Sequence, residues 1–254
     1  MIKQELVTIY IPCRNYGKYV NQSIESVINQ LYSNWELFLV DENSSDNTLD
    51  IFNMFKVKYP DKITVIKNLK PQGLQKIANS ILKLSRGKYM IRLDADDWLD
   101  ESALLILVSK IQSDDSVGLV FGNFYYTDSN GKIIGIERRS NLSKENILNQ
   151  LPPHGAGTLF KTRSLKSVGG YFEDVNAQDG WDLWYKLYLR IGIRSVETPV
   201  FYYRQHQSSL SRDNTRLLKA RDQIFKKIAD NLKGDYKPSV LGVIPIKENY
   251  PNFK

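Results

Sequence analysis

The sequence predicts an α/β fold in which a mostly parallel sheet is flanked by helices. Three runs of apolar and β-branched residues, 6–11, 35–40 and 63–66, are each followed by a segment with apolar residues at helical spacing, and a fourth run covers 89–93. Continuous apolar strands suit a parallel sheet buried on both faces, and repeated strand–helix units favour right-handed, Rossmann-like crossovers. The 254 residues are enough for one large domain with a small appendage.

The composition is that of an ordinary globular protein, with 42% apolar and 25% charged residues. A net charge of +7 fits an anionic substrate, a nucleic acid or an acidic membrane surface, and does not choose among them. Cys13 is the only cysteine, so we expect a small packed side chain and a reducing compartment. No apolar run approaches the roughly twenty residues of a membrane span, and Met1 leads directly into the first strand. We therefore expect a cytoplasmic protein with at most peripheral contact at the inner face of the membrane.

Turn-forming residues mark the ends of the first strands. Pro12 is expected to stop the first strand, and apolar residues between 20 and 31 then predict a helix. The second strand ends in Asp41, and turn formers continue to Asn47. Rossmann-like units use this position to bind a ribose or a base. The Gly-x-Gly-x-x-Gly pattern is absent, which lowers the expectation of a dinucleotide oxidoreductase.

The fourth strand ends abruptly in Asp94, Asp96 and Asp97, where an open α/β sheet binds its ligands. Three acids this close repel one another unless a cation is shared. Mg²⁺ or Mn²⁺ suits such a site, because these ions take one or two carboxylate oxygens and leave the other positions to waters and phosphates. The alternative is that Asp97 or Asp100 caps a helix beginning near Ser102, with the other acids solvated.

The second half is predicted to continue with shorter elements. The pattern predicts a helix over 104–111, a strand over 117–121 and a hairpin turn at 125–131 ahead of 132–136. Loop 152–157 is rigid and rich in small residues. Its His154 fits a wall that faces a substrate, and an ordinary connection is the alternative.

A second acidic cluster, 178–182, opens a helix. Asp179 can be its N-cap, and Asp182 stands at the third helical position like the acid of a capping box. A functional role for either acid is the other reading.

The segment 202–211 places Arg204, His206 and several hydroxyls after a short strand. Such groups can bind phosphate or a metal, although a lone histidine is more often a plain hydrogen-bonding residue. Residues 214–232 predict a basic amphipathic helix, for which a solvated face is favoured over a phospholipid or partner surface.

Together these motifs resemble the inverting, nucleotide-sugar-dependent glycosyltransferases of the GT-A fold, in the large bacterial group called family two. The matching segments are 7–15, 25–30, 40–48, 72–74 with Asn79, 93–98, 169–171, 179–184 and 203–211. The resemblance implies a Rossmann-like, mostly parallel sheet with a small antiparallel subregion on the acceptor side. It implies a domain over 1–212, divided at about residue 100 into a nucleotide-binding and an acceptor half. Beyond the resemblance we expect the basic helix over 213–235 and then residues 236–254, which are either a tail or linker or the start of a second domain.

The resemblance also implies roles for individual residues. Asp96 would hold Mn²⁺ or Mg²⁺ together with His206, and Asp179 would be the general base, with Asp182 as the alternative base. The remaining implied positions are Pro12, Cys13, Arg14, Asn15, Asp41, Asn43, Gln72, Gly73, Arg92, Asp94 and Ala95 for the nucleotide, and Arg204, Ser211, His154 and Trp181 for the diphosphate or the acceptor.

Several positions depart from the family pattern. Glu42 and Asn43 replace the usual Asp and Gly, which leaves the base preference open, and Ala78 stands where many members carry Arg. Gln178 replaces a common Glu, and Gly180 shifts the helix by one residue. No Gln-x-x-Arg-Trp motif occurs, so a processive polysaccharide synthase is not expected.

The function that follows is transfer of a sugar from a nucleoside-diphosphate sugar, with UDP preferred, to a hydroxyl of a saccharide or lipid-linked acceptor in cell-surface polysaccharide synthesis. Alternatives are a metal-dependent sugar nucleotidyltransferase and a non-catalytic nucleotide-sugar-binding module. No nucleic-acid partner is expected, and a homodimer stays open. Residues 239–247 resemble the opening of a sugar cytidylyltransferase, which suggests a fused or associated enzyme of that kind.

Overall fold

The structure is a computed structural model that describes residues 4–139, 154–175, 177, 179–188, 191–206 and 214–231. The first half alternates strands and helices: β1 (Val7–Cys13), α1 (Gly17–Ile28), β2 (Trp35–Asp41), α2 (Thr48–Lys58), β3 (Ile63–Lys67), α3 (Leu74–Leu84) and β4 (Tyr89–Arg92). The second half contains β5 (Trp98–Leu99), α4 (Ala103–Gln112), β6 (Val117–Thr127), β7 (Ile133–Glu137), β8 (Leu159–Lys161), α5 (Thr162–Ser167), α6 (Asp179–Tyr188), β9 (Gly192–Arg204) and α7 (Asn214–Asn231).

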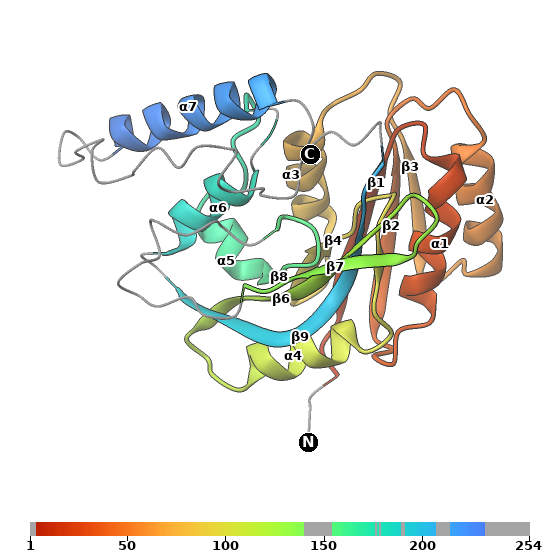
Figure 1. The fold of residues 1–254 in the computed structure, drawn as a ribbon, viewed down its shortest axis with the longest axis horizontal. Coiled ribbons are helices and arrows are strands. Elements are labelled where there is room, and N and C mark those ends of the chain that lie inside the picture. The colour runs from red at the N-terminus through yellow and green to blue at the C-terminus, as the bar shows by residue number, and fades with distance from the viewer. Residues whose placement is uncertain are drawn as a thin grey trace.

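All described strands belong to one curved sheet with the order β3-β2-β1-β4-β8-β6-β9-β5, and β7 pairs with β6 off this path (Figure 1). The pairings among β1, β2, β3 and β4 are parallel, as is the long pairing of β6 with β9. Antiparallel pairings join β8, β7 and β5 to the rest of the sheet. The predicted α/β class, with a mostly parallel sheet and a small antiparallel subregion, is confirmed.

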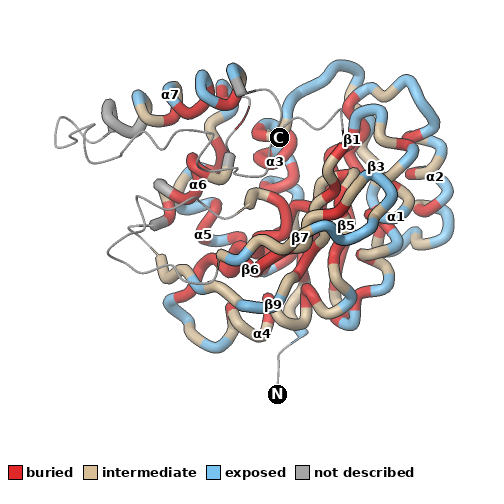
Figure 2. Tube along the Cα trace, in the orientation of Figure 1, coloured by how far each residue is buried: buried red, intermediate tan, exposed pale blue. Residues whose placement is uncertain are grey.

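Side chains that alternate along the parallel strands pack into two separate hydrophobic cores. On β1, Val7, Ile9 and Ile11 pack in one core with residues of α1, α2 and α4. The intervening Tyr10 packs in a second core with residues of α3 and α6. Figure 2 shows the central strands buried, while the covering helices expose their outer sides. A sheet covered on both faces explains why its strands read as continuous apolar runs.

Three strands differ from the expected bounds. β1 continues through Pro12, because β4 pairs only as far as Tyr10 and the proline pairs across from Val40 of β2. β6 reaches Thr127 instead of residue 121, and β9 starts already at Gly192. The short strands β5 and β8 were not predicted. Within the described chain, no helix has the length and apolar character that crossing a bilayer requires.

Candidate active site

The candidate site lies where β1, β2 and β4 end side by side. Cys13 pairs with Asp41 at the carboxyl ends of β1 and β2, and the N–H of Leu93, just beyond β4, donates to the carbonyl of Tyr10 at 3.0 Å. The loops after these strands therefore share one edge of the sheet, which is where open α/β sheets bind ligands.

Asp41 is fully buried at the end of β2. Its Oδ1 accepts the N–H of Ser44 at 3.1 Å, whereas its Oδ2 is buried without a hydrogen-bond partner among the described residues. Leaving a buried acceptor unsatisfied is costly, so this oxygen is suited to accept a hydrogen bond from a ligand. The Asn15 side chain accepts the N–H of Ser45 at 2.7 Å, which ties the β1 loop to the β2 loop.

Glu42 holds a second loop against this edge. Its Oε2 accepts the backbone N–H groups of Gln72 at 2.7 Å and Gly73 at 2.9 Å, and its Oε1 accepts a short hydrogen bond from Asn68 Nδ2. Gly73 has a φ of 88°, a backbone conformation that favours glycine. Sequence reasoning treated Glu42 as a departure from a family pattern and missed this role.

Cys13 and Arg14 contribute little chemistry at the end of β1. Burial raises the pKa of the Cys13 thiol to about 12, although its contact with Thr48 works in the opposite direction. The thiol is therefore neutral at physiological pH, as expected of a packed cysteine rather than a nucleophile. Arg14 is exposed to solvent, and Asn15 and Asn43 each have a φ of 60°.

The acidic loop after β4 holds three carboxylates with three different partners. Asp94 Oδ1 lies 2.9 Å from Nε of the buried Arg92, and Asp96 Oδ2 lies 2.8 Å from His206 Nε2. Asp97 Oδ1 accepts the backbone N–H of Arg204 at 2.8 Å. The Ser23 hydroxyl braces the loop from α1 by donating to the carbonyl of Ala95 at 2.9 Å.

Asp97 is the buried member of this group. Burial, together with the nearby carboxylates of Asp96 and Asp94, raises the pKa of Asp97 well above its ordinary value. Asp97 does not cap the next helix, since it binds Arg204 on β9. Asp100 accepts the N–H of Ser102 at 3.1 Å, so of the two expected caps only Asp100 contacts the helix start.

Arg204 differs from the expected closure over a diphosphate. Its side chain donates to the Asp96 carbonyl at 2.8 Å, the Ser129 carbonyl at 3.0 Å and Gln22 Oε1 at 2.6 Å. The residue is 3% exposed. With these donors bound to protein acceptors, the guanidinium holds the acidic loop in place in this structure.

Asp96 and His206 are suited to hold a divalent cation. No group of three or more acidic, histidine or cysteine side chains that could hold a metal occurs within the described ranges. Mg²⁺ and Mn²⁺ do not require such a group, because they commonly keep several waters and substrate phosphates beside one or two protein ligands. A carboxylate and an imidazole in contact at the binding edge of the sheet fit that requirement.

The two acids of α6 occupy different positions. Asp179 is the first residue of the helix. Asp182 is buried, with Oδ2 accepting the N–H of Phe172 at 2.7 Å and Oδ1 lying 2.7 Å from Lys186 Nζ. Its partners therefore differ from those of a capping box. Ser211, a further position of the expected site, and Gln178, which replaces a common Glu of the family pattern, lie outside the described residues.

Trp181 packs between α6 and α7. Its ring packs edge-on against Phe225 of α7 at 5.7 Å, and the Arg221 guanidinium lies 4.9 Å from the ring centroid. The side chain is buried in this small core. Trp181 thus joins α6 to α7, and its expected role at the diphosphate or the acceptor stays a prediction.

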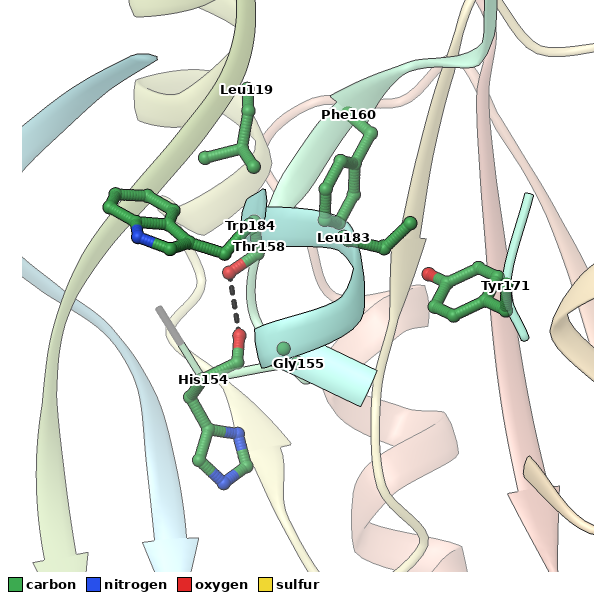
Figure 3. Close-up of a pocket in the computed structure, with 9 residues that line it drawn as sticks. Leu119, His154, Gly155, Thr158, Phe160, Tyr171, Leu183 and Trp184 are labelled. Atoms are coloured by element: carbon green, nitrogen blue, oxygen red, sulfur yellow. Dashed lines mark hydrogen bonds between the residues drawn. The ribbon is translucent and has the colours of Figure 1, made fainter. Parts of the chain in front are cut away.

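His154 lies on the loop that runs beside the end of β4. The loop is attached by a hydrogen bond from the Gly157 N–H to the Arg92 carbonyl at 3.0 Å. The Thr158 hydroxyl donates to the His154 carbonyl at 2.6 Å, and the imidazole points away from a small cavity lined by Leu119, Phe160 and Trp184 (Figure 3). That cavity, of about 10 Å³, has room for roughly one water molecule. It is too small for a sugar, so this cavity, which His154 also lines, is not a sugar site.

The chain is similar in sequence to enzymes that transfer sugars. The chain is 26% identical to Glycosyltransferase GlyG of Streptococcus pneumoniae over 94% of this chain and 85% of the relative. It is also 26% identical to the Escherichia coli enzyme WfaP, a UDP-Glc:alpha-D-GlcNAc-diphosphoundecaprenol beta-1,3-glucosyltransferase, over 88% of this chain and 87% of the relative.

The fold is shared with the crystal structure of S. aureus TarS 1-349 in complex with UDP-GlcNAc. The TM-score is 0.74 at 18% identity, over 97% of this chain and 73% of TarS 1-349. The model of glycosyl transferase family 2 matches residues 8–168, a span that contains β2, β3, β4, nearly all of β1, the Asp41 loop and the acidic loop after β4. The chain therefore belongs to glycosyl transferase family 2.

Proposed function

We propose that this glycosyltransferase moves a sugar from a UDP-sugar to a hydroxyl of a saccharide or lipid-linked acceptor, with inversion at the anomeric carbon. The observation that carries the proposal is the contact of 2.8 Å between Asp96 and His206, at the edge of the sheet where Asp41 also ends its strand. The relative WfaP, whose name gives UDP-Glc as donor and a lipid diphosphate as acceptor, supports the choice of substrate classes.

The nucleoside would bind against the ends of β1 and β2. Asp41 Oδ2, buried without a hydrogen-bond partner among the described residues, would accept a hydrogen bond from the ribose or the base. Glu42 would keep the 72–73 loop closed beside it through its two backbone hydrogen bonds. Asp94, oriented by Arg92, would complete the polar wall.

Asp96 and His206 would hold Mn²⁺ or Mg²⁺ beside the diphosphate. The chemistry that such a cation would supply, when bound, is stabilisation of the negative charge on the leaving diphosphate. Arg204 would act on the same site indirectly, by holding the Asp96 carbonyl and the Asp97 carboxylate.

Asp179 would serve as the general base, the role that the family motif assigns to this position. It would take the proton of the acceptor hydroxyl as that oxygen bonds to the anomeric carbon and the bond to the diphosphate oxygen breaks. A positioned base of this kind contributes about 10²- to 10⁴-fold in rate. The position of Asp179 at the start of α6 agrees with this role.

A thermal-shift comparison of UDP, GDP, CDP and dTDP, each with and without Mn²⁺, tests the donor class. We expect UDP with Mn²⁺ to raise Tm most, and Asp96→Asn to remove the Mn²⁺-dependent part. Asp61→Asn, on an exposed turn, is the matched control. Equal stabilisation of the parent protein by UDP in the presence of a chelator would refute the metal role, and stabilisation by another nucleotide alone would refute the donor assignment.

A further inference from the structure

We infer that Tyr19 and Arg204 are positioning residues, which hold the His206 imidazole against Asp96 through a chain of stacked side chains. This inference deepens the proposed function and rests on its assignment of Asp96 and His206 as metal ligands. Neither the family resemblance nor the sequence pattern assigned a role to Tyr19, which lies on α1 near the other end of the chain.

Two tyrosines of the first half fix the plane of His206. The ring of Tyr19 stacks on the imidazole with centroids 5.2 Å apart and planes inclined by 30°. Tyr16 meets the same imidazole edge-on at 5.8 Å. The His206 side chain is only 5% exposed, so these rings and Asp96 form much of its surroundings. An imidazole held on a ring face keeps Nε2 directed at the carboxylate.

Arg204 connects both members of the ligand pair. Its guanidinium lies 4.8 Å from the Tyr19 centroid, within the range of a cation–π contact. The same guanidinium donates through Nε to the Asp96 carbonyl at 2.8 Å. One buried side chain therefore fixes the backbone of Asp96 and the ring that supports His206.

Aromatic residues on three strands extend the stack into the sheet. The Arg204 guanidinium lies 4.6 Å from the Trp98 ring, Trp98 stacks on Tyr202 at 4.9 Å, and Tyr202 stacks on Tyr125 at 5.2 Å. Both ring pairs are cross-strand partners, since Trp98 of β5 and Tyr125 of β6 each pair with Tyr202 of β9. The sheet thus supplies a rigid base for the guanidinium.

The physical reason for such a support is that a two-ligand site depends on orientation. An imidazole that can rotate away from Asp96 offers the cation a single protein ligand for part of the time. Residues that orient a metal-binding histidine typically change metal affinity by 10- to 100-fold when they are removed. Support by stacking alone places the expected loss at the lower end of that range.

The test uses the full chain with UDP and measures Mn²⁺ affinity from the electron paramagnetic resonance signal of the free ion. We expect Tyr19→Leu, which removes the ring, to weaken Mn²⁺ binding about 10-fold. Tyr19→Phe keeps the ring and should bind Mn²⁺ like the parent. Tyr59→Leu removes a ring of equal size from the end of α2 and is the matched control. Tyr19→Met, whose unbranched and flexible side chain can fill an irregular space, gives the same readout if the leucine variant does not fold.

A second readout follows the imidazole itself. The chain has only two histidines, so the nitrogen resonances of His206 can be observed beside those of His154 as an internal reference. With UDP and Mg²⁺, Tyr19→Leu should shift the His206 signals and leave those of His154 in place. Parent-like Mn²⁺ affinity together with unshifted His206 signals would overturn the positioning role.

The two proposals fail in different ways. If His206→Ala binds Mn²⁺ as tightly as the parent does, the metal site itself is wrong, whatever Tyr19 does. If His206→Ala weakens binding and Tyr19→Leu does not, the metal site stands and only the stacking support is wrong.

Discussion

Lys186 Nζ lies 2.7 Å from Asp182 Oδ1, and the two side chains are 14% and 2% exposed. The ammonium also donates to the Gly170 carbonyl at 2.8 Å and lies 3.5 Å from the Phe172 ring centroid. Burial lowers the pKa of Lys186, and the charge of Asp182 opposes that effect. Asp182 is therefore the counter-ion of a buried cation, which is a structural role. A catalytic base, by contrast, must be free to take up a proton.

We therefore predict that Asp182→Asn destabilises the protein and spares the chemistry. Removing one partner of a buried ion pair typically costs about 3–5 kcal/mol, because the other charge stays buried without compensation. Urea unfolding measures this loss, and kcat per folded molecule should stay near the parent value. Asp222→Asn serves as control, since its ion pair with Lys226 is exposed and contributes little. A stable but inactive Asp182→Asn enzyme would make Asp182 the base.

The complementary variant is Asp179→Asn. Because a positioned base contributes about 10²- to 10⁴-fold in rate, we expect kcat for sugar transfer to fall by that factor. UDP affinity, measured by calorimetry, should not change, since the nucleotide is expected at the ends of β1, β2 and β4. An active Asp179→Asn enzyme would contradict this assignment.

The sequence predicts the parts of this site that are formed by neighbouring residues, and it does not predict the contacts between residues far apart along the chain. The acids Asp94, Asp96 and Asp97 are evident locally, because they end an apolar strand abruptly. The partner of Asp97 is not, since it is the backbone N–H of Arg204 on a strand in the second half of the chain. β9 itself was predicted too short, because its first eight residues are half-exposed or exposed and its continuous apolar run covers only 200–203.

The contacts of Arg204 are a second example of this limit. The sequence correctly singles out Arg204 and His206 as groups that could serve a phosphate or metal site. It gives no sign that Gln22 and Ser129 take two of the guanidinium donors, or that Tyr19 and Trp98 lie beside it. Whether a polar group already has its hydrogen-bond partners within the protein depends on the tertiary structure. This decides whether the group is available to a ligand or instead holds other protein groups in place.

Glu36 predicts a specific loss of stability in acid. This buried carboxylate, at the edge of the sheet opposite the site, accepts the Thr8 hydroxyl at 2.6 Å, the Arg86 N–H at 2.9 Å and Arg86 Nε at 2.7 Å. Burial alone would raise the pKa of Glu36, and these hydrogen bonds lower it below its ordinary value of 4.5. The unfolded chain therefore takes up this proton at a higher pH than the folded protein. The stabilisation is complete above about pH 5 and is lost as the pH falls through the folded-state pKa.

Accordingly, Glu36→Gln should lower the free energy of unfolding at pH 7 by about 1.5–3 kcal/mol, the usual value of hydrogen bonds to a charged group. The difference from the parent should shrink as the pH falls below 4.5, where the unfolded chain takes up the proton, and should level off below the lower folded-state pKa, where the folded parent is protonated too. Urea unfolding at a series of pH values measures both effects. Glu25→Gln, at an exposed position of α1, is the control. A difference that stays constant down to pH 3 would show that the charge of Glu36 is not the cause.

Glu42 offers a test of the loop that is expected to border the nucleotide. Glu42→Ala leaves the N–H groups of Gln72 and Gly73 without the acceptor that lies 2.7 and 2.9 Å away in the parent. We expect the loop to detach and UDP affinity to fall about 10-fold, which corresponds to ~1.4 kcal/mol. Glu42→Gln keeps one carbonyl oxygen that can accept both N–H groups, so it should bind UDP almost like the parent. Calorimetric titration with UDP measures both variants, and equal weakening by Ala and Gln would mean that the charge of Glu42, rather than its hold on the loop, serves the nucleotide.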